Sequence, residues 1–171
     1  MIDKEWDVNS AIERLLALRV DDVMTRYVVH IGSHQTMGDA ARVLQDNKIQ
    51  GAPVVDDRGC CVGVLSGADF VSRARSQTGS GGATSSGTEQ VLVQDQPGDP
   101  YHVERIAGDL VSDHMSTEVR TVAETATILE AARIMCAEHV HRLIVLDPRE
   151  RPTGMVSSLD LVAAMVKSID E

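Results

Sequence analysis

The chain repeats one pattern of apolar and polar positions in its two halves. Short apolar segments at residues 28–31 and 119–122 are typical of strands, and a helical pattern follows each of them. Along both predicted helices the apolar residues recur at intervals of three and four, which places them on one face. These residues are Met37, Ala40, Ala41 and Leu44 in the first half, and Ile128, Ala131, Ala132 and Met135 in the second.

Both helices have matching cap residues at their predicted starts. Thr36 is followed three residues later by Asp39, and Thr127 by Glu130. In such a capping box the threonine hydroxyl and the acidic side chain each accept a hydrogen bond from a backbone N–H that the helix leaves free. We therefore expect the helices to begin directly after the two threonines.

Two more apolar segments and a closing helix complete each half. The polar residues between the segments, "DDRG" and "DPRER", predict a turn. The order is therefore β-α-β-β-α, twice, which predicts an α/β (α+β) fold. The predicted strands are residues 52–55 and 61–65 with a helix at 67–75, and residues 143–146 and 153–156 with a helix at 158–168.

An internal duplication explains the matching halves. A shift of 91 residues, the separation of Gly63 from Gly154, aligns residues 20–71 with 111–162 without a gap. A match of this length indicates two copies of one structural unit. Identical pairs in the alignment include Met24 and Met115, Ser66 and Ser157, and Asp69 and Asp160.

The segments outside the two copies differ in composition. A helical pattern occupies residues 9–18, and Asp99 with Pro100 predicts the start of another helix. The Gly- and Ser-rich stretch before it is typical of a flexible linker. The predicted organisation is an N-terminal helix within 1–19, a first domain at 20–75, a linker at 76–99, a linking helix at 100–110 and a second domain at 111–169.

Composition excludes several classes of function. Apolar residues make up 43% of the chain and charged residues 25%, as in soluble globular proteins. No segment approaches the roughly 18 apolar residues that span a bilayer, and the N-terminal "MIDKEWD" lacks a signal core, so we expect a cytoplasmic protein without membrane association. The net charge of −10 and only four aromatic residues disfavour binding to nucleic acid.

No set of catalytic or metal-binding residues is evident. The glycine-rich run at residues 79–82 lacks the following Lys-Ser/Thr of a phosphate loop. His139 and His141 are too few to hold a metal, and the three cysteines show no CxxC spacing. We therefore expect neither an enzyme nor a metal site, and no required cofactor.

The two copies resemble CBS domains. Each opens with Asp-x-Met-Thr/Ser, "DVMT" or "DHMS", and closes with Gly-φ-φ-Ser-x-x-Asp, where φ is an apolar residue; "APVVD" and "HRLIVLD" match the central strand of the family. The resemblance covers about residues 8–169. It implies two repeats related by pseudo-twofold symmetry (a Bateman module) with two clefts for adenosine-type ligands: AMP, ADP, ATP or S-adenosylmethionine. It also implies a homodimer of such pairs and, because no further domain is present, a separate regulated protein.

The closing motif carries the predicted ligand chemistry. Asp69 and Asp160 can each accept two hydrogen bonds from the neighbouring hydroxyls of a ribose. Ser66 and Ser157 stand at helix starts, where free N–H groups and the helix dipole favour a phosphate. The alternative is purely structural, because Ser-x-x-Asp is also a capping box that stabilises a helix by about 1 kcal/mol.

The second copy also carries His141 and Arg142 before its central strand. This pair resembles a nucleotide-binding repeat of the gamma subunits of AMP-activated protein kinase, and the Arg guanidinium suits phosphate oxygens. The first copy has Gln50 and Gly51 there, without positive charge. The alternative for His141 and Arg142 is a surface pair bound to acidic side chains.

The family pattern implies that adenine lies among aliphatic residues. The candidates are Val28, Val29, Ala52 and Pro53 for one cleft, and Thr121, Val122, Leu143 and Ile144 for the other.

The leading hypothesis is therefore a regulatory module that senses an adenine nucleotide and signals to a partner protein. The alternatives are a structural or dimerisation module with vestigial clefts, a binder of S-adenosylmethionine, and a redox-responsive regulator that uses Cys60 and Cys61.

Overall fold

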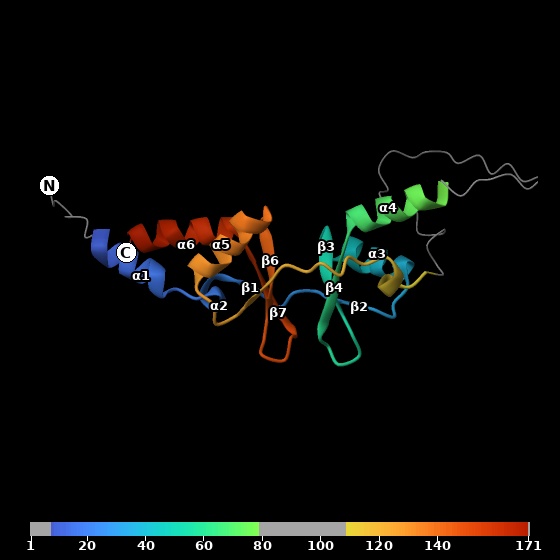
Figure 1. The fold of residues 1–171 in the computed structure, drawn as a ribbon, viewed down its shortest axis with the longest axis horizontal. Helices are drawn as coiled ribbons and strands as arrows, with labels where there is room; N and C mark the ends of the chain where they lie inside the picture. The colour runs from blue at the N-terminus through green and yellow to red at the C-terminus, as the bar shows by residue number, and fades with distance from the viewer. Residues whose placement is uncertain (1–7, 79–108, 171) are drawn as a thin grey trace, which may run out of the picture.

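The computed structural model describes residues 8–78 and 109–170, which form two layered halves. In each half helices cover the outer face of a sheet, and the two sheets face one another at the centre of the molecule (Figure 1). The predicted order β-α-β-β-α is confirmed in both halves. The first half contains β2 (Ile31–Gly32), α3 (Met37–Asp46), β3 (Gly51–Val55), β4 (Cys61–Ser66) and α4 (Gly67–Thr78); the second contains β5 (Thr121–Ala123), α5 (Ile128–Glu138), β6 (Arg142–Leu146), β7 (Pro152–Ser157) and α6 (Ser158–Asp170).

The central helices begin at the predicted caps. Thr36 Oγ1 accepts a hydrogen bond of 3.1 Å from Asp39 N, and Thr127 Oγ1 accepts one of 3.2 Å from Glu130 N. Glu130 completes its box by accepting from Thr127 N at 2.7 Å. The predicted apolar face of α3 is buried, and so is that of α5 apart from the half-buried Ala132.

Several predicted boundaries differ from the structure. The first strand of each half begins later than expected because pairing starts only where Ile31 lies beside Val54 and Thr121 beside Ile144. Helix α4 continues to Thr78, so residues 76–78 of the predicted linker are helical. The remainder of that linker and residues 100–108 of the predicted linking helix lie outside the described residues, and Asp109 and Leu110 are not helical.

Residues 8–26, which we call the leading segment of the first repeat, pack in the second half of the structure. Helix α1 (Val8–Ala17) packs against α6, and α2 (Val20–Val23) leads into β1 (Thr25–Arg26), which extends the second sheet. The strand orders are β1-β7-β6-β5 and β2-β3-β4, with Thr25 beside Met155. The sequence patterns did not predict α2 or β1.

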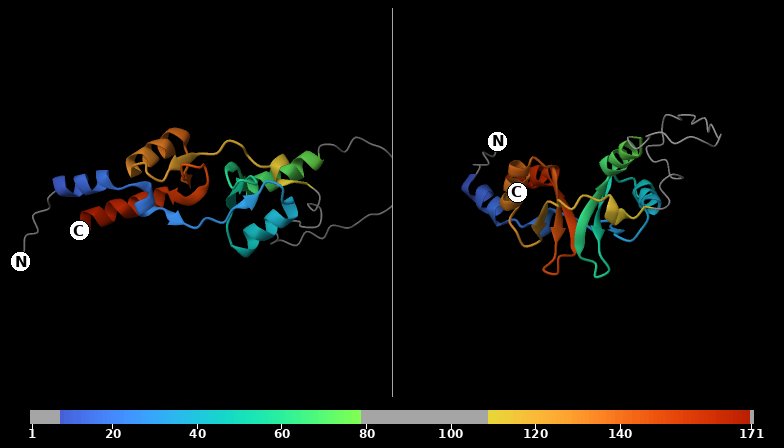
Figure 2. Two further views of the ribbon diagram at one scale, coloured as in Figure 1. Left: turned by 90° about the horizontal axis from the view of Figure 1, so that it is seen from below. Right: turned by 45° about the vertical axis from the view of Figure 1, so that its right-hand side comes forward.

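The leading segment of the second repeat, from Val111 to Ser116, packs in the same way against the first half of the structure. After the 3₁₀ turn η2 (Val111–Asp113), Ser116 forms an antiparallel bridge with Val64 of the first sheet. Figure 2 shows the two connecting segments passing between the halves in opposite directions.

Matching backbone contacts show that the exchange obeys the internal symmetry. Val20 N donates to Ala126 O at 2.8 Å, and Val111 N, 91 residues later, donates to Gln35 O at 2.9 Å. Val20 lies in the core of the second half and Val111 in that of the first, both fully buried. Each hydrophobic core is therefore completed by residues from the other repeat.

Gly63 and Gly154 make the exchange sterically feasible. A Cβ atom on Gly154 would lie 2.5 Å from Met24 Sδ and 2.8 Å from Thr25 O. One on Gly63 would lie 2.5 Å from Met115 Sδ and 3.0 Å from Ser116 O. The motif glycines thus admit a methionine and its backbone from the leading segment of the other repeat.

We predict that Gly154→Ala lowers the free energy of unfolding by about 1–3 kcal/mol, because the new methyl group overlaps Met24 and the Thr25 carbonyl. Gly32→Ala is the matched control, since its Cβ atom would meet nothing closer than Gln35 Cγ at 3.6 Å. Urea denaturation measures both. In a double-mutant cycle with Met24→Ala, strictly additive effects would contradict the proposed Met24–Gly154 packing.

The two hairpin turns are held by equivalent aspartates. Asp56 Oδ1 accepts hydrogen bonds from Cys60 N and Arg58 N at 2.8 and 2.9 Å, and Asp147 Oδ1 accepts from Arg151 N and Arg149 N at 2.9 and 2.8 Å. These backbone donors, above all Cys60 N and Arg151 N, hold the pKa of each carboxyl below its usual value.

Since these pKa values are lower in the folded chain than in the unfolded chain, both carboxylates stabilise the fold above about pH 4. That stabilisation is lost as the pH falls through the folded pKa values. We expect a double variant, Asp56→Asn with Asp147→Asn, to lose less stability than the wild type between neutral and acidic pH. Urea denaturation across that range measures the difference, and parallel pH profiles would contradict this role.

Candidate functional site

Two cavities of about 570 Å³ each lie between the halves. Each cavity contains a residue from the start of a closing helix, and we name the cavities after these residues: the Asp160 cleft and the Ser66 cleft. The Asp160 cleft is lined by Thr25, Tyr27, Val28, Val29, Lys48, Ile49, Gln50, Gly51, Arg142, Met155, Ser157 and Asp160.

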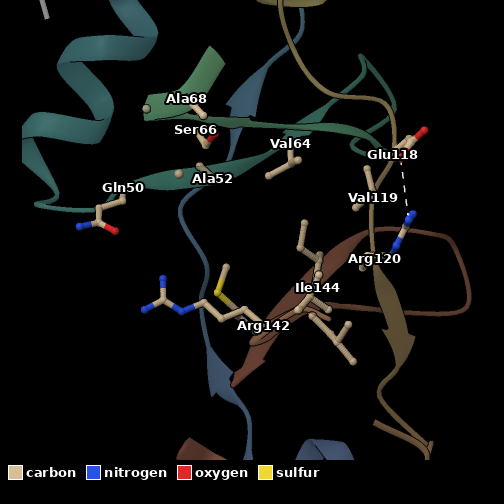
Figure 3. A pocket seen from close by; sticks show the side chains of 15 residues that line it. Gln50, Ala52, Val64, Ser66, Ala68, Glu118, Val119, Arg120, Arg142 and Ile144 are labelled. Carbon is tan, nitrogen blue, oxygen red and sulfur yellow. Dashed lines mark ion pairs between the residues drawn. The ribbon is translucent and has the colours of Figure 1, made fainter. Parts of the chain in front are cut away.

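The Ser66 cleft is mainly apolar (Figure 3). Ser66 and Ala68 lie on one side of it with Ala52 and Val64, and Ile144 and Arg142 lie on the opposite side. The segment from Glu118 to Arg120 closes one end. Its complete lining is Gln50, Gly51, Ala52, Val64, Ser66, Gly67, Ala68, Glu118, Val119, Arg120, Val140, Arg142, Leu143, Ile144 and Met155.

Each cleft combines a helix start from one repeat with apolar residues from the other. Ser157 and Asp160 share a cleft with Val28 and Val29 of the first repeat. Ser66 shares one with Leu143 and Ile144 of the second repeat, as well as with Ala52. This arrangement follows from the crossing of the leading segments.

Some predicted site residues do not line either cavity. Pro53 and Val122 are buried, and the Val122 side chain belongs to the core of the second half. Thr121 lies in β5, and His141 is exposed. Asp69 lies beside the cleft, hydrogen-bonded to Ser66, without lining it.

Both motif aspartates cap a helix start, and Ser157 also completes its capping box by accepting a hydrogen bond of 3.2 Å from Asp160 N. Asp160 Oδ2 accepts from Ser157 N at 2.8 Å and from Ser157 Oγ at 2.6 Å. Asp69 Oδ2 accepts from Ser66 N at 2.7 Å and from Ser66 Oγ at 2.9 Å. Within the described chain neither Oδ1 atom makes a hydrogen bond, so capping leaves half of each carboxylate available to accept one.

Arg142 lies between the clefts and lines both. It begins β6, and its register partner in β7 is Ser157. Neither Arg142 nor His141 forms an ion pair with any described residue, so the acidic-partner alternative for this pair is not observed. The guanidinium therefore retains its full capacity to bind an anion.

The clefts differ in their remaining charges. The Asp160 cleft contains Lys48, which makes no ion pair among the residues described. In the Ser66 cleft Arg120 is already bound, through Nε to Glu138 Oε2 at 2.8 Å and through Nη2 to Glu118 Oε2 at 3.8 Å (Figure 3 shows the latter pair). The Asp160 cleft is therefore the better site for a phosphate.

Sequence reasoning missed several residues of the clefts, including Lys48, Gln50, Arg120 and Met155. The 91-residue shift carries a signal for some of them. It pairs Tyr27 with Glu118 and Val29 with Arg120, positions at which the two copies differ in chemistry. Such differences inside a duplication indicate where the two sites have diverged.

Residues 8–78 and 109–170 contain neither a metal-binding cluster nor a membrane-spanning helix. Within these ranges no group of three or more His, Cys, Asp or Glu side chains is arranged to hold a metal ion. The helices found there are too short or too polar to cross a membrane.

Comparison with known proteins identifies the family. The model of the CBS domain matches residues 20–76 and 109–167. The uncharacterised protein MJ1426 of Methanocaldococcus jannaschii is 26% identical over 162 residues, which cover 86% of this chain and 90% of that protein. Homoserine O-acetyltransferase of Methanohalophilus mahii is 34% identical over 61 residues, and these cover 36% of this chain but only 12% of the enzyme.

Solved structures show the same fold. CBSX2 of Arabidopsis thaliana in complex with AMP has a TM-score of 0.63 and 22% identity, covering 88% of this chain and 98% of that chain. The CBS domain pair of MJ0100, in complex with 5′-methylthioadenosine and S-adenosyl-L-methionine, has a TM-score of 0.59 and 19% identity, covering 87% and 96%. The CBS domain of a bacterial CNNM/CorC Mg²⁺ transporter, in complex with ATP, has a TM-score of 0.64 and 19% identity, covering 91% and 92%. This chain therefore belongs to the CBS domain family and contains two copies of the domain.

Proposed function

We propose that the protein binds an adenine nucleotide in the Asp160 cleft and that the bound nucleotide regulates a partner protein. One observation carries this proposal: a single cavity contains the Arg142 guanidinium and the Asp160 carboxylate. Among the described residues Arg142 has no acidic partner, and Asp160 Oδ1 makes no hydrogen bond. A cation for phosphate and an acceptor for ribose are the two polar features that a nucleotide requires.

The sugar and phosphate interact with the start of α6. Asp160 Oδ1 accepts hydrogen bonds from the ribose hydroxyls while Oδ2 continues to cap the helix. The phosphate lies against the positive end of the helix dipole, with Arg142 and Lys48 as its cationic neighbours. Two cations suit a nucleotide of low charge, such as AMP, better than ATP.

The base occupies the apolar part of the cleft. Val28, Val29 and Ile49 supply aliphatic surface there, in keeping with a purine held mainly by burial of its faces. AMP, ATP and S-adenosyl-L-methionine are bound by the CBS-domain structures compared above, which supports an adenosine-type ligand. The cationic sulfonium of S-adenosylmethionine would face Lys48 and Arg142, which disfavours that alternative.

Regulation, rather than catalysis, is the proposed output. Binding can change the protein's activity toward a partner only if the nucleotide favours one of two conformations. The homodimer implied by the family has a candidate surface on α6, where Leu159, Val162 and Val166 are more than half exposed. We further propose that the regulated partner is a separate protein and that this protein is located in the cytoplasm.

We predict that AMP raises the melting temperature, since a ligand at 100 times its Kd stabilises the folded state by about 2.7 kcal/mol. Arg142→Ala and Asp160→Ala should each reduce this shift, with a smaller effect for Asp69→Ala. Arg133→Ala, an exposed residue of α5 that lines neither cleft, is the matched control. Thermal denaturation and calorimetry measure the effects. No heat and no shift with AMP, ADP or ATP would favour the structural module with vestigial clefts.

The helix caps formed by Asp69 and Asp160 provide a control experiment on the protein without ligand. Because Asp160 and Asp69 accept the same hydrogen bonds, we expect alanine at either position to lower the free energy of unfolding by a similar amount, about 1 kcal/mol. Urea denaturation of the apo protein measures this. A much larger loss for Asp160→Ala would mean that its weaker AMP response reflects misfolding instead of a lost ribose contact.

A further inference from the structure

Tyr27 has an unusual backbone conformation and an unusual exposure. It follows β1 directly, its φ is +60°, and 95% of its surface is accessible to solvent. The left-handed region is rarely occupied by a bulky side chain. Packing within the fold therefore does not explain why an aromatic residue occupies this position.

Other left-handed residues in the described chain have local explanations. His139 is the C-cap of α5, and Lys48 directly follows the C-cap of α3. Glu150 lies in the β6–β7 turn. Tyr27 belongs to neither a helix end nor a hairpin turn, and strain of this kind is concentrated at functional sites.

The position of Tyr27 is fixed beside the Asp160 cleft. The preceding residues, Thr25 and Arg26, pair with Met155 and Gly154 of β7, so the tyrosine is attached to an ordered strand. Tyr27 is one of the residues that line the same cavity as Asp160 and Arg142, and its high exposure places it at the edge of that cavity. The equivalent residue at the Ser66 cleft is Glu118, which is charged and cannot stack on a base.

Building on the proposed function, we propose that Tyr27 is the base-stacking residue of the Asp160 cleft and makes the site selective for ligands that carry a nucleobase. In the nucleotide complex the tyrosine ring covers one face of the adenine at the mouth of the cavity, while aliphatic residues hold it from within. The exposed ring is then the part of the site that the ligand completes. Stacking of a base on an aromatic side chain strengthens binding by about 5- to 150-fold.

The test compares AMP with ribose 5-phosphate, which keeps the sugar and phosphate but lacks the base. Calorimetry on the full chain measures both affinities for the wild type, Tyr27→Ala and Tyr27→Phe. We expect Tyr27→Ala to weaken AMP binding about 5- to 150-fold and to leave ribose 5-phosphate binding unchanged. Tyr27→Phe keeps the ring and should retain wild-type affinity for AMP. Arg133→Ala, which lines neither cleft, is the matched control and should also retain wild-type affinity for AMP.

A glycine variant separates binding from folding. Glycine adopts a φ of +60° without steric cost, so Tyr27→Gly should not lower the melting temperature of the apo protein although it weakens AMP binding. Equal losses of AMP and ribose 5-phosphate affinity in Tyr27→Ala, or an AMP affinity equal to that of the wild type, would overturn the stacking role. If the wild-type protein binds no AMP, the proposed function itself is wrong and the stacking role fails with it.

Discussion

The exchange of leading segments between the two repeats is the constraint on which the rest of the structure depends. Met24 enters the second half and Met115 approaches the first, each over a glycine that has no room for a side chain. This close approach lets Thr25 and Ser116 pair with the strand of the opposite sheet. Without it neither core would be complete and neither cleft would have its second wall.

Divergence of the two copies gives the clefts different chemistry on one scaffold. Arg142 corresponds to Gly51, so a single guanidinium lies where the two cavities meet. In the Ser66 cleft the charge of Arg120 is taken up by Glu138 and Glu118. The two copies therefore give one scaffold two cavities with different charges, and the proposed phosphate site rests on Arg142 and Lys48 in the Asp160 cleft.

Local features of the structure could be predicted from the sequence, whereas the pairing of distant segments could not. The caps at Thr36 and Thr127 and the buried faces of the helices depend on residues three or four positions apart. The two motif glycines are evident in the sequence, but no local pattern shows that a methionine from the other repeat fills the space beside each of them. Pro53 and Val122 were proposed for the clefts because an apolar strand residue has the same pattern whether it faces a core or a cavity.

The reciprocal exchange also has a consequence for the origin of the fold. A half-length ancestor with only one copy would have lacked part of its own interior, since Val20 and Val111 each fill the half to which they do not belong in sequence. Such a polypeptide could have become compact only by associating with an identical molecule and trading its first residues with it. With both copies in one chain, that exchange becomes a contact within a single molecule, and each copy can mutate separately.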